Sequence, residues 1–312
     1  MNLLLIFLGF FLLVIGGEFI VRSSVALSLK LNISKFVIGM TVVSFATSLP
    51  ELIVSVNAAL NNSPSIAINN VVGSNIANIG IVLGLISILS NVQVDKKFLN
   101  RDWPVMFIFS ALLFLFTFND FLLTQLEGLI FFILILAYIY YFLKKPRYRT
   151  INNTNINLQI SSVTNFKICL WIILSILSLY FGAEFLVGGA VDFAKQINIS
   201  EAVISVTIIA IGTSIPELAA SLVAIAKNEE GLSVGNLIGS NIFNIGSVLG
   251  ITAIIKPILI TDEILYRDIV WMLIFAILIF ILAIIPEKNK ISKYKGTTLF
   301  LAYIYFVYVA LV

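Results

Sequence analysis

Long apolar segments recur along the whole of this 312-residue chain, and this feature restricts its fold more than any other. About 20 consecutive apolar residues in an α-helix span the hydrocarbon core of a lipid bilayer. Backbone that faces lipid must satisfy its hydrogen bonds internally, so each segment is predicted to be mostly helical. Ten segments are expected, at residues 2–21, 34–60, 67–90, 103–118, 121–143, 166–190, 200–226, 233–255, 268–286 and 296–312.

The composition supports a membrane protein and excludes several functional classes. Hydrophobic residues make up 60% of the chain and charged residues only 11%, whereas soluble domains carry about 25% charged residues. The net charge of +3 is too small to suggest nucleic-acid binding. Histidine is absent and Cys169 is the one cysteine, which excludes internal disulfides, histidine-ligated zinc and Ser–His or Cys–His catalysis. The N-terminus lacks a basic n-region and a cleavage site, so residues 2–21 are predicted to be a spanning helix and not a signal peptide.

The distribution of basic residues predicts the orientation in the membrane. If the N-terminus is extracytoplasmic, all of the 19 Lys and Arg residues except Lys195, Lys256 and Arg267 fall at cytoplasmic ends and loops. Basic residues concentrate on the cytoplasmic side of membrane proteins. An even number of spans then places both termini outside. The basic, Asn-rich connection 144–165 is predicted to be a cytoplasmic linker that is too short for a folded domain.

The two halves of the chain repeat each other at one offset of 166 residues, from Thr47 to Thr213. The matching pairs of segments are 16–19 and 182–185, 32–34 and 198–200, 47–52 and 213–218, 73–76 and 239–242, and 78–80 and 244–246. A period this long is not that of a solenoid. It predicts an all-α membrane protein of ten transmembrane helices in two inverted five-helix repeats, residues 1–143 and 166–312. Inverted repeats are typical of secondary transporters, whose binding sites lie near the bilayer midplane.

Two carboxylates occupy equivalent places deep within apolar segments, Glu51 in the first repeat and Glu217 in the second. A charged side chain at the bilayer centre costs about 2.5–3.5 kcal/mol on insertion scales. No Lys or Arg lies deep in any predicted span, so the compensating partner is expected to be a mobile cation or a proton. A single buried glutamate could simply be protonated and hydrogen-bonded, but its repetition in matching segments favours a function.

Oxygen-bearing side chains surround each glutamate in the predicted helices. Thr47, Ser48 and Ser55 share a helix face with Glu51, and the same types recur around Glu217. The next helix carries a stripe of Asn70, Ser74 and Asn78, repeated as Asn236, Ser240 and Asn244. Such ligands, without thiol or imidazole, suit hard cations such as Ca²⁺ and Na⁺. The alternative is that these small polar residues only hold helices together.

Prolines and glycines in the same motifs predict local backbone features. Pro50 and Pro216 should break the helical hydrogen bonds just before each glutamate and free the carbonyls of Ala46 and Gly212. Exposed backbone at membrane depth is tolerated where it lines a cavity. The glycines of the second motif are expected to be close-packing residues rather than ligands; they are Gly73, Gly80, Gly239 and Gly246. Glu18 is expected to pair with Arg22, four residues later on the same helix, in a structural role, and Glu184 likewise to be structural.

The paired segments resemble the two alpha-repeats of the calcium/cation antiporter superfamily, most closely its prokaryotic sodium/calcium exchanger-type branch. The first signature of that family stands at residues 46–51 and 212–217, and the second at 73–78 and 239–244. The resemblance covers essentially the whole chain. It implies that Glu51 and Glu217 bind Ca²⁺ and share Na⁺, and that helices 2–21 and 166–190 form a sliding gate. It implies further ligands through side chains or backbone carbonyls at Ser44, Thr47, Ser48, Ser74, Asn78, Ala210, Thr213, Ser214, Ser240 and Asn244.

The resemblance predicts antiport of Ca²⁺ against Na⁺ by alternating access, in a prokaryotic inner membrane, with the lipid bilayer as surroundings and without a cofactor or an obligate protein partner. One departure is Asn244, where well-studied exchangers often carry an aspartate. The site then holds two formal negative charges, which bears on ion affinity and selectivity. Exchange of H⁺ for Ca²⁺ or another divalent cation remains the alternative. An intramembrane enzyme is disfavoured because histidine is absent and the aspartates lie near segment ends, and a channel is disfavoured by the inverted repeat.

Overall fold

The computed structural model describes residues 2–94, 98–144, 163–197, 212–287 and 289–311, almost all of them helical. The chain divides into two compact units: Met1–Thr47 with Phe142–Gly239, and Ser48–Tyr141 with Ser240–Val312. Each unit draws segments from both halves of the chain. The boundary between the predicted sequence repeats is therefore different from the boundary between the compact units.

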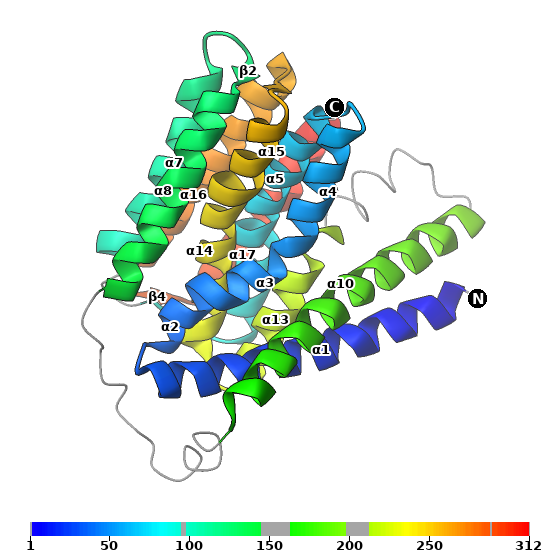
Figure 1. Ribbon diagram of the computed structural model, residues 1–312, viewed down its shortest axis with the longest axis vertical. Coiled ribbons are helices and arrows are strands. Elements are labelled where there is room, and N and C mark those ends of the chain that lie inside the picture. Colours follow the sequence, from blue (N-terminus) through cyan, green and yellow to red (C-terminus); the bar gives the residue numbers. More distant parts are fainter. Residues whose placement is uncertain (1, 95–97, 145–162, 198–211, 288, 312) are drawn as a thin grey trace. The chain divides into compact units, whose positions relative to one another are not determined.

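The first unit is built on two long helices, α1 (Asn2–Leu31) and α10 (Asn165–Gln196), which lie side by side (Figure 1). Their backbones approach closely at glycines: a Cβ on Gly9 would lie 2.5 Å from the Leu186 nitrogen, and one on Gly182 would lie 2.9 Å from the Leu13 nitrogen. Small residues allow helices to meet at such short range inside a membrane. The Thr164 hydroxyl caps the start of α10 by accepting a hydrogen bond from the backbone nitrogen of Lys167.

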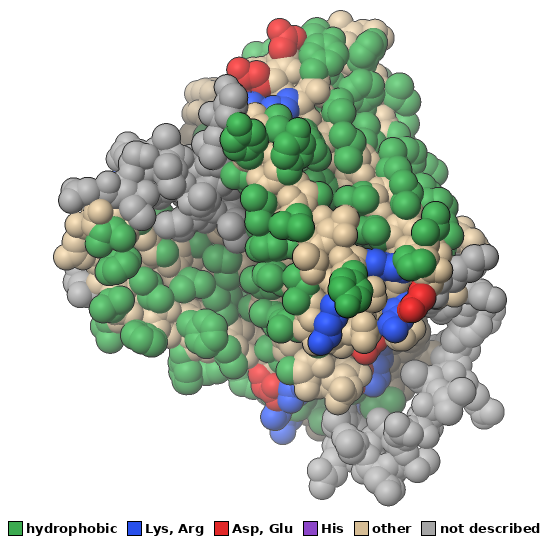
Figure 2. All heavy atoms as spheres, turned by 180° about the vertical axis from the view of Figure 1, so that it is seen from behind, with side chains coloured by type: hydrophobic (Ala, Val, Ile, Leu, Met, Phe, Trp, Pro, Cys, Tyr) green, Lys and Arg blue, Asp and Glu red, His purple; other side chains and the backbone are tan. Residues whose placement is uncertain are grey.

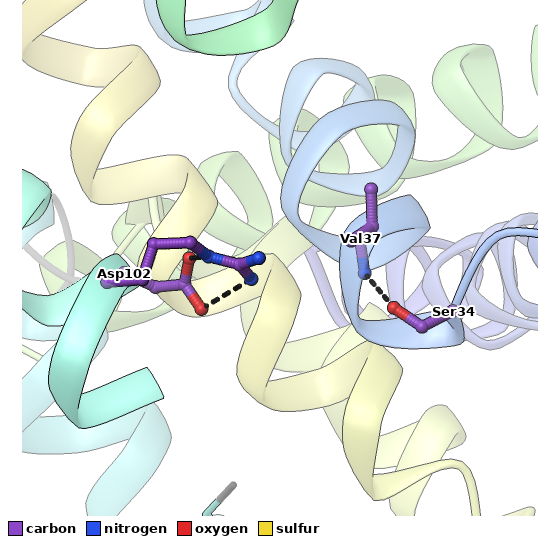
Figure 3. Close-up of polar contacts among 4 residues, drawn as sticks. Ser34, Val37 and Asp102 are labelled. Atoms are coloured by element: carbon purple, nitrogen blue, oxygen red, sulfur yellow. Dashed lines mark hydrogen bonds and ion pairs between the residues drawn. The ribbon is translucent and has the colours of Figure 1, made fainter. Parts of the chain in front are cut away.

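Shorter helices complete the first unit. They are α2 (Lys35–Ile38), the π-helical η1 (Gly39–Val43), α3 (Ser44–Thr47), α13 (Ile215–Ala226) and the part of α14 (Glu230–Phe243) up to Gly239. The Ser34 hydroxyl caps α2 by accepting from the backbone nitrogen of Val37 at 3.3 Å (Figure 3). The core of this unit is aliphatic, with Ile20 of α1 and Leu179 of α10 fully buried in it.

The second unit contains the remaining helices. They are α4 (Leu49–Leu60), α5 (Ser65–Ala77), η2 (Asn78–Leu83), α6 (Gly84–Leu89), η3 (Phe98–Asp102), α7 (Trp103–Thr117), α8 (Gln125–Lys144), η5 (Asn244–Leu249), α15 (Gly250–Ile255), η6 (Ile264–Ile269), α16 (Val270–Ile284) and α17 (Lys293–Leu311). Helix α7 packs against α16 (Figure 1), and the Trp103 indole donates a hydrogen bond to the Ala276 carbonyl at 2.6 Å. Asp102 is fully buried and accepts two hydrogen bonds from the Arg101 guanidinium (Figure 3). The equivalent pair, Arg267 and Asp268, makes the same contacts.

Two short antiparallel strand pairs tie the halves of the chain together within the second unit. β1 (Val92–Gln93) pairs with β4 (Lys290–Ile291), and β2 (Leu122–Leu123) pairs with β3 (Ile258–Leu259). In both pairs one strand comes from the first repeat and the other from the second. The two pairs are thus related to each other by the repeat, a feature that the sequence pattern did not predict.

The predicted all-α membrane fold is confirmed. Among the described residues, seven helices are long and apolar enough to span a membrane, and an eighth span results if Lys35–Thr47 and Leu49–Leu60 are taken together. The total of ten spans stays a prediction, because the expected segment 200–226 begins outside the described residues. Helix α1 continues to Leu31, ten residues beyond its predicted end at 21.

Large apolar side chains point outward from these helices. Figure 2 shows hydrophobic side chains over most of one face of the molecule, with few charged ones among them. Phe7 and Phe11 of α1 are 72% and 60% exposed, and Ile133 of α8 and Leu301 of α17 are more than half exposed. Soluble monomers rarely expose apolar surface on this scale, so these side chains face lipid.

Candidate cation site

Each of the two repeated glutamates lies in the first turn of a helix that starts inside an apolar segment. Glu51 is in the first turn of α4 and Glu217 in the first turn of α13, and both side chains are fully buried. The first turn of a helix carries backbone N–H groups without helical partners and the positive end of the helix dipole. Both carboxyl groups thus lie at the positive end of a helix dipole.

The prolines create these helix starts. Helix α3 ends at Thr47 and α4 begins at Leu49, so the helix is interrupted at Ser48. Ser48 precedes α4 with φ −86° and ψ 2°, and Ser214 precedes α13 with φ −88° and ψ 3°. Proline is well accommodated in a first turn because its missing N–H would have no helical partner there. The predicted break is confirmed before Glu51, and a helix starts with nearly the same geometry before Glu217, where the segment up to residue 211 lies outside the described residues.

In the first compact unit, buried hydrogen bonds connect three of the motif helices. The Thr47 hydroxyl on α3 donates to Asn236 Oδ1 on α14 at 3.1 Å. The amide nitrogen of Asn236 donates to the Ser221 hydroxyl at 3.3 Å, and Ser221 lies one turn after Glu217 on α13. Asn236 therefore fixes the helix that carries Glu217 relative to the helix that carries Thr47.

The other predicted ligands of this unit have varied surroundings. Ser44 is buried, and its hydroxyl donates to the Met40 carbonyl at 2.8 Å, while its own carbonyl lies 3.4 Å from the Thr47 hydroxyl. Thr213 is half-buried. Ser214 is buried, and its hydroxyl has no hydrogen-bond partner in the described part of the chain. Ala210 lies outside the described residues.

In the second compact unit, the predicted stripe on α5 faces the helix of Glu51. The Asn70 amide nitrogen donates to the Ser55 hydroxyl at 3.2 Å and to the Glu51 carbonyl at 3.4 Å. Ser74 follows one turn later and is fully buried. Asn70 therefore holds α4 against α5 with its amide donors, which is the helix-packing role that was the alternative for the stripe.

The two remaining predicted amide ligands stand at the starts of π-helical segments. Asn78 begins η2 and Asn244 begins η5, and both side chains are fully buried. Asn78 Nδ2 donates to Asn241 Oδ1, and Asn244 Nδ2 donates to Asn75 Oδ1, both at 3.1 Å. Their own Oδ1 atoms make no hydrogen bond within the described residues. Asn75 and Asn241 were not among the predicted ligands, although both recur in register as part of the second motif.

The available ligands are oxygens of carboxylates, amides and hydroxyls. Within the ranges that the structure describes, no group of three or more His, Cys, Asp or Glu side chains is placed so that it could hold a metal ion. A buried polar atom without a partner costs about 1–3 kcal/mol. Such oxygens recur at equivalent places in both repeats, on Ser48 with Ser214 and on Asn78 with Asn244. This chemistry suits a hard cation such as Ca²⁺ or Na⁺ and offers no soft-metal ligand set.

The glycines and Glu18 behave mostly as their positions predicted. A Cβ added to Gly80 would lie 2.8 Å from the Tyr303 side chain, and one added to Gly239 would lie 2.6 Å from the Met40 carbonyl oxygen. These two glycines therefore allow close packing. Gly246 is similarly crowded, but a Cβ on Gly73 would meet no atom of the described residues within 4 Å, so the close packing expected at Gly73 is not found there. Glu18 pairs with Arg22, as expected, and also with Lys227 at 2.9 Å.

Comparisons with known proteins give a consistent picture. The family described as sodium/calcium exchanger protein matches residues 1–144 and 167–312. The sodium/calcium exchanger MaX1 of Methanosarcina acetivorans is 31% identical over 350 aligned positions, which cover 99% of this chain and 98% of that protein. The inner membrane protein YrbG of Escherichia coli is 32% identical over 265 positions, covering 81% of this chain and 79% of that protein.

A solved structure is similar over nearly the same length. It is that of the sodium-calcium exchanger NCX_Mj soaked with Na⁺ and Sr²⁺, and it superposes with a TM-score of 0.82 at 31% sequence identity. The similarity covers 98% of this chain and 97% of that one.

Proposed function

Since the chain belongs to the sodium/calcium exchanger family of membrane cation antiporters, we propose that it exchanges Ca²⁺ for Na⁺ by alternating access. The observation that carries the proposal is the duplicated helix start, which begins a new helix at a buried glutamate in each repeat. Glu51 and Glu217 are the principal ligands of the transported ions. Neither ion is a resident cofactor, and the family is one of transporters and not of enzymes.

The further proposed ligands are the oxygens that accompany the glutamates. They are the hydroxyls or carbonyls of Ser44, Thr47, Ser48, Ser74, Ala210, Thr213, Ser214 and Ser240, and the amide oxygens of Asn78 and Asn244. Support comes from the burial of Ser44, Thr47, Ser48, Ser74, Ser214, Ser240, Asn78 and Asn244. Further support comes from the oxygens of Ser48, Ser214, Asn78 and Asn244, which have no hydrogen-bond partner in the described residues. Ala210 enters through the repeat alone, as the counterpart of Ser44.

Na⁺ is the proposed coupling ion. The fully buried hydroxyls of Ser74 and Ser240 are uncharged oxygen ligands of the kind that Na⁺ accepts. A proton would need only the two glutamates and would leave these serines without a role in coupling. Exchange of protons for Ca²⁺ is the alternative, in which protonated Glu51 and Glu217 take the place of the Na⁺-loaded state.

Uptake of radioactive Ca²⁺ into proteoliposomes tests the proposal. Vesicles loaded with Na⁺ should take up Ca²⁺, whereas K⁺-loaded vesicles and vesicles with only a pH gradient should not. Glu217→Gln should abolish uptake. Glu184→Gln is the matched control, because Glu184 is an exposed glutamate of α10 outside the proposed ligands. Uptake driven by the pH gradient alone would replace Na⁺ coupling by proton coupling.

The charge of the ligands predicts the electrical behaviour. With two carboxylates and neutral Asn78 and Asn244, a Ca²⁺-loaded site is neutral, and a site loaded with three Na⁺ carries one positive charge. Exchange of three Na⁺ for one Ca²⁺ should therefore carry current and respond to membrane potential. Transport without current in voltage-clamped vesicles would exclude this stoichiometry.

We also propose a prokaryotic inner membrane location, with both termini outside and a cytoplasmic linker at 144–165 between repeats 1–143 and 166–312. The basic residues support this orientation. A Cys169→Ser background allows single cysteines to be placed elsewhere. A cysteine at Asn153 should react with a membrane-impermeant maleimide only after the cell is permeabilised. Labelling in intact cells would show that the orientation is the opposite of the proposed one.

A further inference from the structure

A reciprocal asparagine pair lies between the second-motif helices of the two repeats, within the second compact unit. Asn75 Nδ2 donates to the backbone carbonyl of Asn241 at 3.2 Å, and Asn241 Nδ2 donates to the backbone carbonyl of Asn75 at 3.3 Å. The same nitrogens contact the sulfur atoms of Met272 and Met106 at 3.6 and 3.7 Å. Both side chains are at most 2% exposed, so the pair exchanges no hydrogen bonds with solvent.

The backbone carbonyls determine which way each side chain of the pair is turned. A carbonyl oxygen can only accept a hydrogen bond, so the side-chain group that faces it must be the NH₂ group. The oxygen of Asn75 then faces Asn244, and the oxygen of Asn241 faces Asn78. Each of these oxygens accepts the amide nitrogen of its neighbour at 3.1 Å.

This polarity is passed on to the proposed amide ligands. Because Asn78 and Asn244 each point their amide nitrogen at an acceptor, the amide oxygen of each points away from that acceptor. Both oxygens are buried and make no hydrogen bond among the described residues. A flipped amide would set two oxygens against each other and turn an NH₂ group toward the cation. A cation needs the oxygen, so the orientation of each amide decides whether the residue is a ligand at all.

We propose that Asn75 and Asn241 are positioning residues that hold the carbonyl oxygens of the amide ligands toward the transported cation. The arrangement is crosswise: Asn75 orients Asn244, and Asn241 orients Asn78. This inference rests on the proposed function, because it assumes that these two oxygens bind the transported ion. It also accounts for Asn244, since an ionised aspartate at that position could not donate to Asn75 Oδ1.

A double-mutant cycle tests the crosswise arrangement through Ca²⁺ affinity. Asn75→Leu removes the acceptor at similar volume, and it should raise the KM for Ca²⁺ about tenfold with little change in kcat, as one ligand loses its orientation. In an Asn244→Asp background the same change should not raise KM, because both ends of a carboxylate are oxygens and the repulsion from Asn75 Oδ1 is relieved. In an Asn78→Asp background the tenfold loss should persist. Asn241→Leu should show the mirror pattern, with its effect suppressed by Asn78→Asp.

A purely structural role would give the same loss in every background and would overturn the proposal. Asn75→Ala, which also removes the acceptor, is the second variant if Asn75→Leu does not yield folded protein. The cycle is repeated as equilibrium binding of Ca²⁺ to the purified full-length protein without any gradient. Crosswise coupling in binding, together with no Na⁺-dependent uptake by wild type, would sink the proposed function and retain the positioning role. Na⁺-dependent uptake by wild type without crosswise coupling would retain the proposed function and overturn the positioning role.

Discussion

Replacing Gly239 by alanine tests the close approach of α14 to the π-helical segment η1. A Cβ on Gly239 would lie 2.6 Å from the Met40 carbonyl and 2.6 Å from the Ser44 hydroxyl, whereas ordinary contact begins at 3.4 Å. The backbone would have to move by about 0.8 Å, the difference between 3.4 and 2.6 Å. Gly231 on the same helix is the matched control, because its nearest neighbour would be Phe36 at 3.6 Å.

The expected magnitude follows from three contributions. Overpacking costs about 1–3 kcal/mol, and displacing Ser44 loses its hydrogen bond to Met40, worth about 1 kcal/mol. Alanine gains about 1 kcal/mol over glycine within a helix. Gly239→Ala should therefore destabilise the protein by about 1–3 kcal/mol. Gly231→Ala should be neutral or stabilising by up to about 1 kcal/mol.

Thermal unfolding of the detergent-solubilised protein at one fixed scan rate measures the difference. At about 2 °C per kcal/mol for a chain of this size, Gly239→Ala should lower the apparent Tm by about 2–6 °C. Gly231→Ala should leave it unchanged or raise it slightly. If Gly239→Ala unfolds at or above the wild-type temperature, the close approach of α14 to η1 is incorrect.

Three further substitutions have defined outcomes in the same unfolding assay. Thr47→Val leaves the buried Asn236 oxygen without its donor and should lower the stability by about 1–3 kcal/mol. Thr47→Ser keeps the hydroxyl and should retain most of this stability. Equal Tm values for the two variants would contradict the hydrogen bond. Trp103→Phe removes the indole donor to a backbone carbonyl and should cost about 1 kcal/mol, and an unchanged Tm would show that the bond contributes nothing. Lys227→Ala breaks a partly exposed ion pair with Glu18 and should cost less than about 1 kcal/mol, with the effect vanishing at high salt; a large, salt-insensitive loss would point to a packing role.

Sequence periodicity predicted the features that depend on local order along the chain. The membrane class follows from apolar segment length, and the helix starts before Glu51 and Glu217 follow from the prolines, because both signals lie within a few residues of their effects. The glutamates stood out because a buried charge is costly and these two recur in register. Segment ends were less predictable: α1 continues to Leu31, since Arg22 pairs with Glu18 on the helix surface and does not end the helix.

The candidate ligands were also visible in the sequence, but their orientation was not. An asparagine carries a donor and an acceptor on one planar group, and its own position in the chain does not say which end faces a cation. For Asn78 and Asn244 that choice depends on the side-chain oxygens of Asn241 and Asn75, each of which belongs to the other repeat. The same limit applies to Asn236, whose link from Thr47 to Ser221 joins three helices.

The sequence alone determined that this chain is a helical membrane protein with duplicated motifs, because hydrophobic length, proline position and repeat register are properties of order along one dimension. The tertiary structure decided which side chains of the two repeats meet. The Asn75–Asn241 pair and the two strand pairs join residues more than 130 positions apart. Contacts at that separation depend on how the repeats fold around each other, and hydrogen-bond polarity is set only when donor and acceptor face each other in space.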